Sequence, residues 1–256
     1  MIVGAGRVGL SLARGLAGVE TVRVLTRSAR GAARVRSLGL RVATPSDVAS
    51  ADLCVLAVGD PEVPRAARAL ARHLPPRTAL VHTAGALTLD AFGPGARARS
   101  RGSFHPLRAV SQPGQSLEGT TFAVAATTSA LKRRLMRWVR ALHGHPLDVR
   151  ERDRVRYHAA AVLSASMLVT LVDLAAEAAF RPSQRTAARN ALLKLAESAI
   201  EGVTTRGYAE GLTGPVARGD VATIARHAQA LSGDAKEIYR RLAKRALRRH
   251  RSGWAR

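Results

Sequence analysis

The first half of the chain alternates short apolar runs with amphipathic stretches of helical period. Such alternation predicts parallel strands joined by helices that cover both faces of one sheet. The run at 53–58 is apolar throughout, as a central strand of a parallel sheet should be. Strands are expected at 1–3, 22–25, 40–43, 53–58, 79–82, 103–105, 121–126 and 146–149. Helices are expected at 8–17, 29–38, 61–74 and 130–142, with Asp47 capping a short turn at 48–51.

The pattern changes near residue 150. Beyond it, apolar residues recur at helical spacing over 153–180, 183–206, 220–231 and 234–249, with Ser183 as a cap and a loop at 211–215. The sequence therefore predicts an α/β domain over residues 1–150 and an all-α domain over residues 151–256. No charge-free apolar stretch reaches the ~18 residues of a membrane span, so no membrane-crossing helix is expected.

A glycine-rich turn stands between the first expected strand and the first expected helix. It has the pattern G-x-G-x-x-G, in which the first glycine permits a tight turn, the second a close approach of a diphosphate, and the third close helix packing. Free N–H groups at the helix start then bind the diphosphate. This context predicts a doubly wound Rossmann domain that binds a dinucleotide through Gly4, Ala5, Gly6, Arg7, Val8 and Gly9.

The end of the second strand indicates which dinucleotide is bound. NAD sites usually carry a carboxylate there, whereas this chain has Thr26, Arg27 and Ser28. A guanidinium pairs well with the 2′-phosphate of NADP, so NADP is favoured and NAD stays open. The alternative is a solvated arginine in an arginine-rich chain. The ends of two later strands complete the expected cofactor site, with Val58, Gly59, His82, Thr83 and Ala84.

The chain is strongly basic, with a net charge of +23. Only four of its 41 basic residues are lysine, and the arginines are spread along the sequence. We interpret the arginines as solvated side chains on helix faces, present because of a GC-rich coding bias, rather than as a nucleic-acid-binding patch. The positive charge would still attract anionic ligands. Cys54 is the only cysteine, so no intrachain disulfide is possible. It lies in an apolar run and is expected to be a small buried residue. A cytoplasmic enzyme is the expected setting.

Four further motifs carry a family resemblance. They are 82–85 (HTAG), 102–107 (GSFHPL), 157–161 (YHAAA) and 212–220 (LTGPVARGD). In this order the chain resembles Rossmann-like proteins whose C-terminal helical domain has no known function. That family is similar to pyrroline-5-carboxylate reductase and the 6-phosphogluconate dehydrogenase superfamily, and some members resemble an alternative ketopantoate reductase. The resemblance implies an NAD(P)-dependent reductase that forms a homodimer through its C-terminal helices.

The family helix that corresponds to the one with His158 typically carries an asparagine two turns later, where this chain has Ser166. Positions 158, 162 and 166 are expected to share one helix face. A serine hydroxyl replaces only part of the hydrogen bonding of an amide. The replacement of this asparagine by Ser166 is therefore expected to affect the choice of substrate or the activity itself.

Hydride transfer to a carbonyl needs a proton donor, and residues 153–180 contain no lysine. His158 is the group on that helix suited to acid–base work near neutral pH, and His105, at a strand end, is the second candidate. Either histidine also suits a purely structural hydrogen bond. Both are expected as catalytic residues, and no metal is expected.

Substrate contacts are expected from the second domain. Arg218 suits a bidentate clamp on a carboxylate, and Asp220 either orients it or caps the following helix. Thr213 and Ser166 offer hydroxyl groups.

The leading hypothesis is an NADP-dependent oxidoreductase that reduces a small anionic carbonyl or imine, with a 2-oxo acid such as ketopantoate as first guess. A non-catalytic NADP-binding regulator and a nucleic-acid-associated basic protein are the alternatives. Because the first strand is very short, a few residues are also expected to precede Met1 in the native chain.

Overall fold

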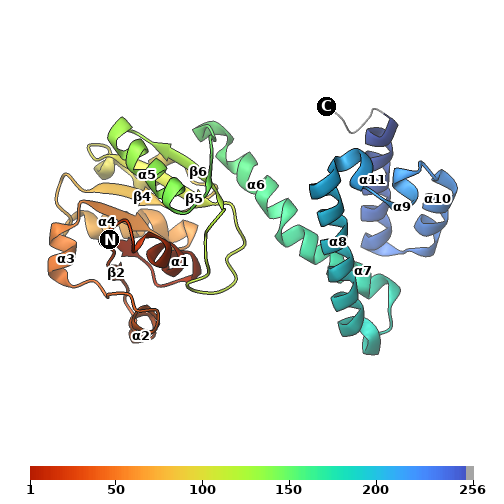
Figure 1. The fold of residues 1–256 in the computed structure, drawn as a ribbon, viewed down its shortest axis with the longest axis horizontal. Coiled ribbons are helices and arrows are strands. Elements are labelled where there is room, and N and C mark those ends of the chain that lie inside the picture. Colours follow the sequence, from red (N-terminus) through yellow and green to blue (C-terminus); the bar gives the residue numbers. More distant parts are fainter. Residues whose placement is uncertain (252–256) are drawn as a thin grey trace. The chain divides into compact units, whose positions relative to one another are not determined.

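The computed structural model of the chain describes residues 1–251. They form two compact units, Met1–Val162 and the part that begins at Leu163. The first unit is an α/β domain and the second is helical (Figure 1). The α/β class and the all-α second part are thus confirmed. The boundary between the units falls inside a helix, beyond the expected residue 150, because the first turns of that helix pack on the sheet.

One seven-stranded sheet organises the first unit. Its spatial order is β2 (Val24–Leu25), β1 (Ile2–Val3), β3 (Leu53–Leu56), β4 (Ala79–His82), β5 (Arg101–Pro106), β6 (Thr121–Ala126) and β7 (His145–Leu147). The reversal of strand order beside β1 is the doubly wound feature that creates a ligand crevice at the carboxyl ends. Ile2 pairs with Val24 on one side and with Val55 on the other.

The sheet is mixed rather than purely parallel, because β5 and β6 run antiparallel. Parallel neighbours need a crossover connection, usually a helix, and residues 107–120 between these strands contain none. The chain instead turns back through a loop that is closed by a 2.8 Å hydrogen bond from Leu107 N to the carbonyl oxygen of Thr121.

Helices cover both faces of the sheet. One face packs against α1 (Arg7–Leu16), α2 (Ala29–Ser37) and α5 (Ser129–Ala141), and the other against α3 (Pro45–Ser50) and α4 (Val63–Ala71). Alternate residues of β3 supply the two cores, since Val55 lies in the first and Cys54 and Leu56 lie in the second.

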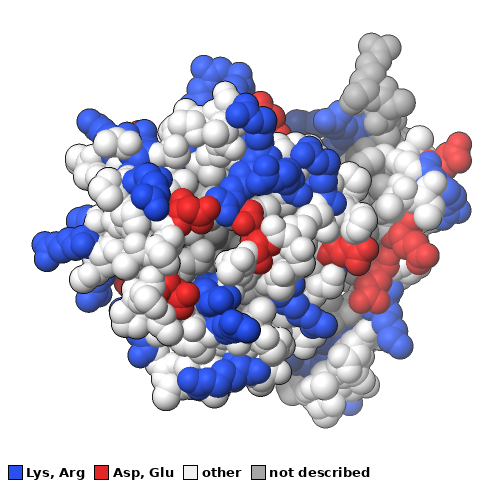
Figure 2. Space-filling view, turned by 60° about the vertical axis from the view of Figure 1, so that its left-hand side comes forward, with Lys and Arg blue, Asp and Glu red and all other residues white. Residues whose placement is uncertain are grey.

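On the face that Figure 2 shows, Lys and Arg side chains lie among acidic and uncharged residues. A hollow on α11 (Gly233–Arg251) is lined by five basic residues, Arg241, Lys244, Arg245, Arg248 and Arg249.

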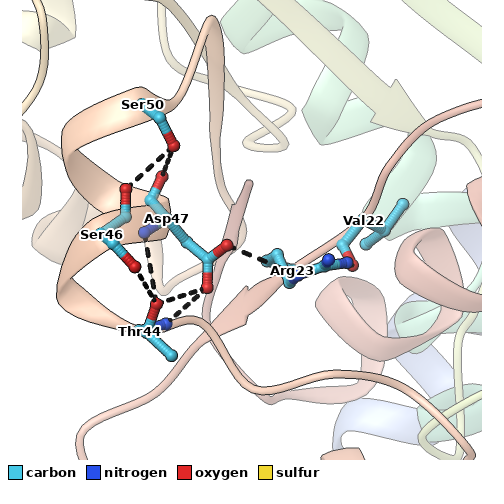
Figure 3. A network of polar contacts seen from close by, with 6 residues as sticks. All are labelled: Val22, Arg23, Thr44, Ser46, Asp47 and Ser50. Carbon is cyan, nitrogen blue, oxygen red and sulfur yellow. Dashed lines mark hydrogen bonds and ion pairs between the residues drawn. The ribbon is translucent and has the colours of Figure 1, made fainter.

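Two local expectations around α3 are wrong. Residues 40–43 form only an isolated bridge, between Val24 and Val42. The cap of α3 is Thr44, whose side chain accepts a hydrogen bond from Asp47 N at 3.3 Å while the Asp47 carboxylate accepts one from Thr44 N at 2.8 Å (Figure 3). Asp47 is therefore the third helical residue of a capping box, and Arg23 contacts it at 3.5 Å.

The single helix expected over 153–180 is two helices. A 3₁₀ turn (Glu151–Asp153) leads into α6 (Arg154–Ser164), and α7 (Ser166–Ala179) follows a break at Ala165, whose φ of −120° and ψ of −82° are not helical. His158 and Val162 share a face within α6, but the break at Ala165 means that this face does not continue regularly to Ser166.

By length and composition, one described stretch, Glu151–Ala179, passes the test for a membrane span, counter to the expectation from the sequence. One such stretch is weak evidence, because it rests on length and composition alone. The break at Ala165 divides it into helices of 11 and 14 residues. Each is shorter than the ~20 residues that span a bilayer.

The second unit continues with α8 (Arg185–Gly211), α9 (Gly214–Ala217), α10 (Val221–Ala230) and α11 (Gly233–Arg251). α8 is kinked at Gly207, where φ is 75°. Ser183 does not cap α8, because it lies within a 3₁₀ turn and the capping position is Gln184. Asp220 caps α10 by accepting a 2.9 Å hydrogen bond from Thr223 N.

Candidate functional site

The glycine turn after β1 has a geometry that only glycine permits. Gly4 has a φ of +114°, and a Cβ on it would lie 2.3 Å from the carbonyl oxygen of Ala57. A Cβ on Gly9 would lie 2.1 Å from the carbonyl oxygen of Gly4. A Cβ on Gly6, in contrast, would meet no atom of the described residues within 4 Å. The first and third glycines thus serve packing, and the second faces open space in which a diphosphate can approach the backbone.

A cleft of about 820 Å³ opens at this turn. The predicted cofactor residues that line it are Gly4, Ala5, Gly6, Thr26, Arg27, Ser28, Val58 and Gly59. Arg7, Val8 and Gly9 form the first turn of α1 and are not lining residues. The cleft therefore gathers the ends of β1, β2 and β3, as a dinucleotide site requires.

The end of β2 favours a negative ligand group. Ser28 caps α2, with its hydroxyl accepting a 3.0 Å hydrogen bond from Gly31 N. The first turn of α2 consists of Ala, Arg and Gly residues, so its positive helix end faces no acidic side chain of its own turn. Arg27 is exposed beside this helix end, at the rim of the cleft.

The sequence interpretation missed the contribution of α4 to the cleft. Five residues from α4 and the 3₁₀ turn before it also line the cleft: Glu62, Arg65, Ala66, Ala69 and Leu70. These residues are spaced three and four positions apart in the sequence, so they share one helix face. This spacing could have identified them from the sequence. The apolar members suit the face of an adenine ring, while Arg65 supplies a second guanidinium. The residues present thus fit a dinucleotide that carries an additional phosphate.

A second group of candidate residues meets at the ends of β4 and β5. His105 Nδ1 lies 2.7 Å from Tyr157 Oη, and the His105 and His158 rings are 5.6 Å apart in an edge-to-face arrangement. Both rings face Gly85, where a Cβ would lie 2.4 Å from His158 Nδ1 and 2.9 Å from His105 Nε2. The structure thus brings the two predicted catalytic histidines together, and it adds Tyr157, which the sequence interpretation had not assigned a role.

Arg154 is the least expected member of this group. Its side chain is fully buried, with Nε donating to the carbonyl oxygen of Leu87 at 2.6 Å and Nη2 to Ser103 Oγ at 2.6 Å. Glu151 lies 3.9 Å from its Nη1. In a chain so rich in arginine, this residue was indistinguishable from the solvated ones. It ties the first turn of α6 to the loop after β4 and to β5.

His82 lies in the core rather than at a ligand surface. Its ring is fully buried 5.3 Å from that of Phe92, and burial, aided by the nearby Arg154 charge, lowers its pKa to about 4. Thr83 and Ala84 are also buried. The side chain of His82 therefore has no surface for the cofactor contact that was expected of it.

The remaining candidates belong to the second unit. Ser166 is an exposed residue at the start of α7, and Thr213 and Arg218 are exposed at the two ends of α9. Asp220 takes the capping role that the sequence left as one alternative, and the hydrogen bonds from Thr223 lower the pKa of its carboxyl.

Comparisons with known proteins agree with this architecture. Residues 1–103 match the model of a Rossmann-like domain, and residues 120–246 match that of a domain of unknown function, DUF2520. No curated protein matches the sequence.

Three solved structures have a similar fold over nearly the whole chain. A protein from Bacteroides fragilis, named as a candidate NADP oxidoreductase, has a TM-score of 0.74 at 21% identity and 97% coverage of both chains. The 1-pyrroline-5-carboxylate reductase of Streptococcus pyogenes has a TM-score of 0.63 at 13% identity, with 98% and 97% coverage. The pyrroline carboxylate reductase of Plasmodium falciparum, with NADP bound, has a TM-score of 0.57 at 11% identity, with 98% and 96% coverage.

Proposed function

Because the chain joins a Rossmann-like domain to a DUF2520 domain, we propose that it is an NADP-dependent oxidoreductase that reduces a small carbonyl or imine. A 2-oxo acid such as ketopantoate is the first substrate to test. The similar folds of an NADP-bound pyrroline carboxylate reductase and of a candidate NADP oxidoreductase support this assignment.

The cleft at the glycine turn carries the proposal. Gly6 faces open space beside the first turn of α1, where free N–H groups bind a diphosphate. Arg27 and Arg65 both line the cleft, and β2 ends without a carboxylate. Two guanidinium groups suit the 2′-phosphate that distinguishes NADP from NAD.

Each group of the chain then has a simple task. The bound cofactor supplies a hydride to the substrate carbon. His105 lies near the carboxyl end of β5, where α/β sheets place their ligands, and His158 on α6 faces it with the rings 5.6 Å apart; the two hydrogen-bond the reacting oxygen or nitrogen. Arg218, with Ser166 and Thr213 as hydroxyl groups, stays the prediction from the sequence for contacts to a substrate carboxylate.

Binding of NADPH and NADH to purified protein tests the cofactor assignment. Replacing Arg27 or Arg65 by Ala removes a charge-assisted hydrogen bond worth about 1.5–3 kcal/mol. The dissociation constant of NADPH should rise at least ~10-fold, while that of NADH stays the same. Arg68→Ala is the matched control, since Arg68 lies on α4 but does not line the cleft. Equal losses for both cofactors, or for the control, would argue against a 2′-phosphate contact.

Turnover distinguishes the enzyme from a cofactor-binding regulator. NADPH consumption is measured with a panel of 2-oxo acids and cyclic imines, and His158→Ala should lower any rate observed. Tight NADPH binding without turnover on the whole panel would favour the regulator. Steeply salt-dependent binding of DNA or RNA without NADPH binding would favour the nucleic-acid alternative.

We also propose that the protein is a homodimer through its C-terminal helices. Large apolar side chains of α7 and α8 are exposed within the second unit, with Val169 58%, Leu195 64% and Ile200 51% exposed. Burial of such surface drives association. Sedimentation analysis should show a dimer that Leu195→Asp converts to monomer, and a monomeric wild type would contradict it.

A further inference from the structure

The hydrogen bond between Tyr157 and His105 has a direction that decides what His105 can do. It joins Tyr157 Oη to His105 Nδ1 at 2.7 Å, and the two rings also make an edge-to-face contact at 5.5 Å. A neutral imidazole has one N–H group, so either Nδ1 accepts from the phenol or it donates to it. The first case leaves the ring proton on Nε2, and the second leaves Nε2 with a lone pair.

The surroundings favour the neutral ring. Burial, then the neighbouring His158, then the positive charge of Arg154 lower the pKa of His105 to about 4. His82, on the adjacent strand β4, is itself uncharged at neutral pH because its pKa also lies at about 4. Imidazole nitrogen is a stronger hydrogen-bond acceptor than phenol oxygen. Burial raises the pKa of Tyr157, so the phenol stays protonated and donates a hydrogen bond to His105 Nδ1.

The other nitrogen of His105, Nε2, faces the loop that follows β4. A Cβ on Gly85 would lie 2.9 Å from Nε2 and 2.4 Å from His158 Nδ1, so both ring nitrogens face this glycine. His158 Nδ1 is buried and has no hydrogen-bond partner among the described residues. Gly85 follows β4 and His105 lies on β5, so both belong to the carboxyl edge of the sheet, where Rossmann domains bind the reacting end of their ligands.

Arg154 holds the arrangement in place. Its guanidinium donates to the Leu87 carbonyl oxygen and to Ser103 Oγ, which links α6 to the loop after β4 and to β5. Tyr157 lies one helical turn after Arg154 on α6, so the anchored helix presents its phenol to His105.

We propose that Tyr157 is a positioning residue that holds His105 as its neutral Nε2–H tautomer, so that His105 is an uncharged hydrogen-bond donor to a carbonyl oxygen. The role of donor rests on the proposed reductase function, whereas the tautomer does not. An uncharged donor stabilises the negative charge that develops on the oxygen during hydride addition. The proton that the product finally needs then comes from His158 or water, and not from His105.

The tautomer can be read directly, without cofactor or substrate. In the full-length protein labelled with ¹⁵N-histidine, the His105 ring should show a protonated Nε2 and an unprotonated Nδ1 at neutral pH. His105→Gln identifies the signals by their disappearance. An Nδ1–H tautomer, or a charged His105 at neutral pH, in the wild type overturns the proposal whether or not any variant folds.

The contribution of Tyr157 is tested with a matched pair of variants. Tyr157→Phe should leave the ring contact but let both tautomers of His105 appear. The chain offers a second pair of the same kind, in which Tyr239 Oη lies 2.9 Å from His227 Nδ1, so Tyr239→Phe should leave the His105 signals unchanged. If Tyr157→Phe keeps the pure Nε2–H tautomer, Tyr157 is not the positioning residue.

Where turnover is found, a second comparison tests the role of donor. A glutamine amide can donate a hydrogen bond from a similar position but cannot give up a proton at neutral pH. His105→Gln should therefore keep at least ~10-fold more activity than His105→Ala, which corresponds to ~1.4 kcal/mol of transition-state stabilisation. Equal activities of the two variants would overturn the role of His105 as a hydrogen-bond donor.

Discussion

Glu20 offers a direct test of how α5 is held on the sheet. Its carboxylate accepts hydrogen bonds from Arg134 Nε at 2.8 Å, Arg134 Nη2 at 2.6 Å and Trp138 Nε1 at 2.7 Å. Arg134 also donates to Asp52 at 2.7 Å. The Glu20 and Arg134 side chains are only 18% and 24% exposed. Glu20→Ala therefore removes three charge-assisted bonds from a largely buried group.

The expected loss follows from these contacts. Breaking a fully buried ion pair by removing one partner costs about 3–5 kcal/mol. Here water can reach part of the site and Arg134 keeps Asp52, so Glu20→Ala should lower the free energy of unfolding by about 2 kcal/mol. Glu20→Gln should cost less, because its amide oxygen can still accept from Trp138.

The stabilisation also depends on pH in a defined direction. The hydrogen bond from Arg134 is the largest cause that holds the pKa of Glu20 below its ordinary value. Stability from a carboxylate with a lowered pKa is present above the unfolded-state pKa of about 4.3 and is lost as the pH falls through the folded-state pKa. The difference in stability between wild type and Glu20→Ala should therefore narrow below about pH 4.

Urea unfolding followed by tryptophan fluorescence measures this difference, since Trp138 contacts Glu20 directly. Glu118→Ala, at an exposed glutamate, is the control and should change stability by less than ~0.5 kcal/mol. A loss from Glu20→Ala no larger than that of the control, or a difference that does not narrow in acid, would refute the reasoning.

Three further predictions test the site and its support. Gly85→Ala should lower turnover about 100-fold, because its Cβ would lie 2.4 Å from His158 Nδ1 and displace the ring by ~1 Å; steady-state rates within ~3-fold of wild type would contradict it. Thr44→Ala should destabilise the protein by ~1 kcal/mol in urea unfolding, because α3 loses its cap. Burial raises the pKa of Cys54 to about 12, so a thiol reagent should react with it only after unfolding, and rapid labelling of native protein would disprove this.

Local patterns explain what the candidate site shares with the sequence interpretation. The glycine turn and the end of β2 were predicted because turn chemistry and strand ends are encoded within a few neighbouring residues, and the two histidines were predicted from the family resemblance together with their positions. The face of α4 that lines the cleft was equally local and was simply overlooked. His82 was misassigned, since an apolar strand that ends in histidine does not show whether the ring faces a ligand or the core.

The sequence by itself determined the order of most strands and helices, the glycine geometry at the cleft and the change to helices in the second half. Each of these follows from hydrophobic period and turn residues within about ten positions. The tertiary structure alone decided the antiparallel return of β6, the break at Ala165, and the burial of Arg154. It also brought His105 to Tyr157, 52 positions away, and Arg154 to Leu87, 67 positions away. Such pairs depend on how α6 packs against the sheet, and this packing cannot be predicted from a local sequence pattern.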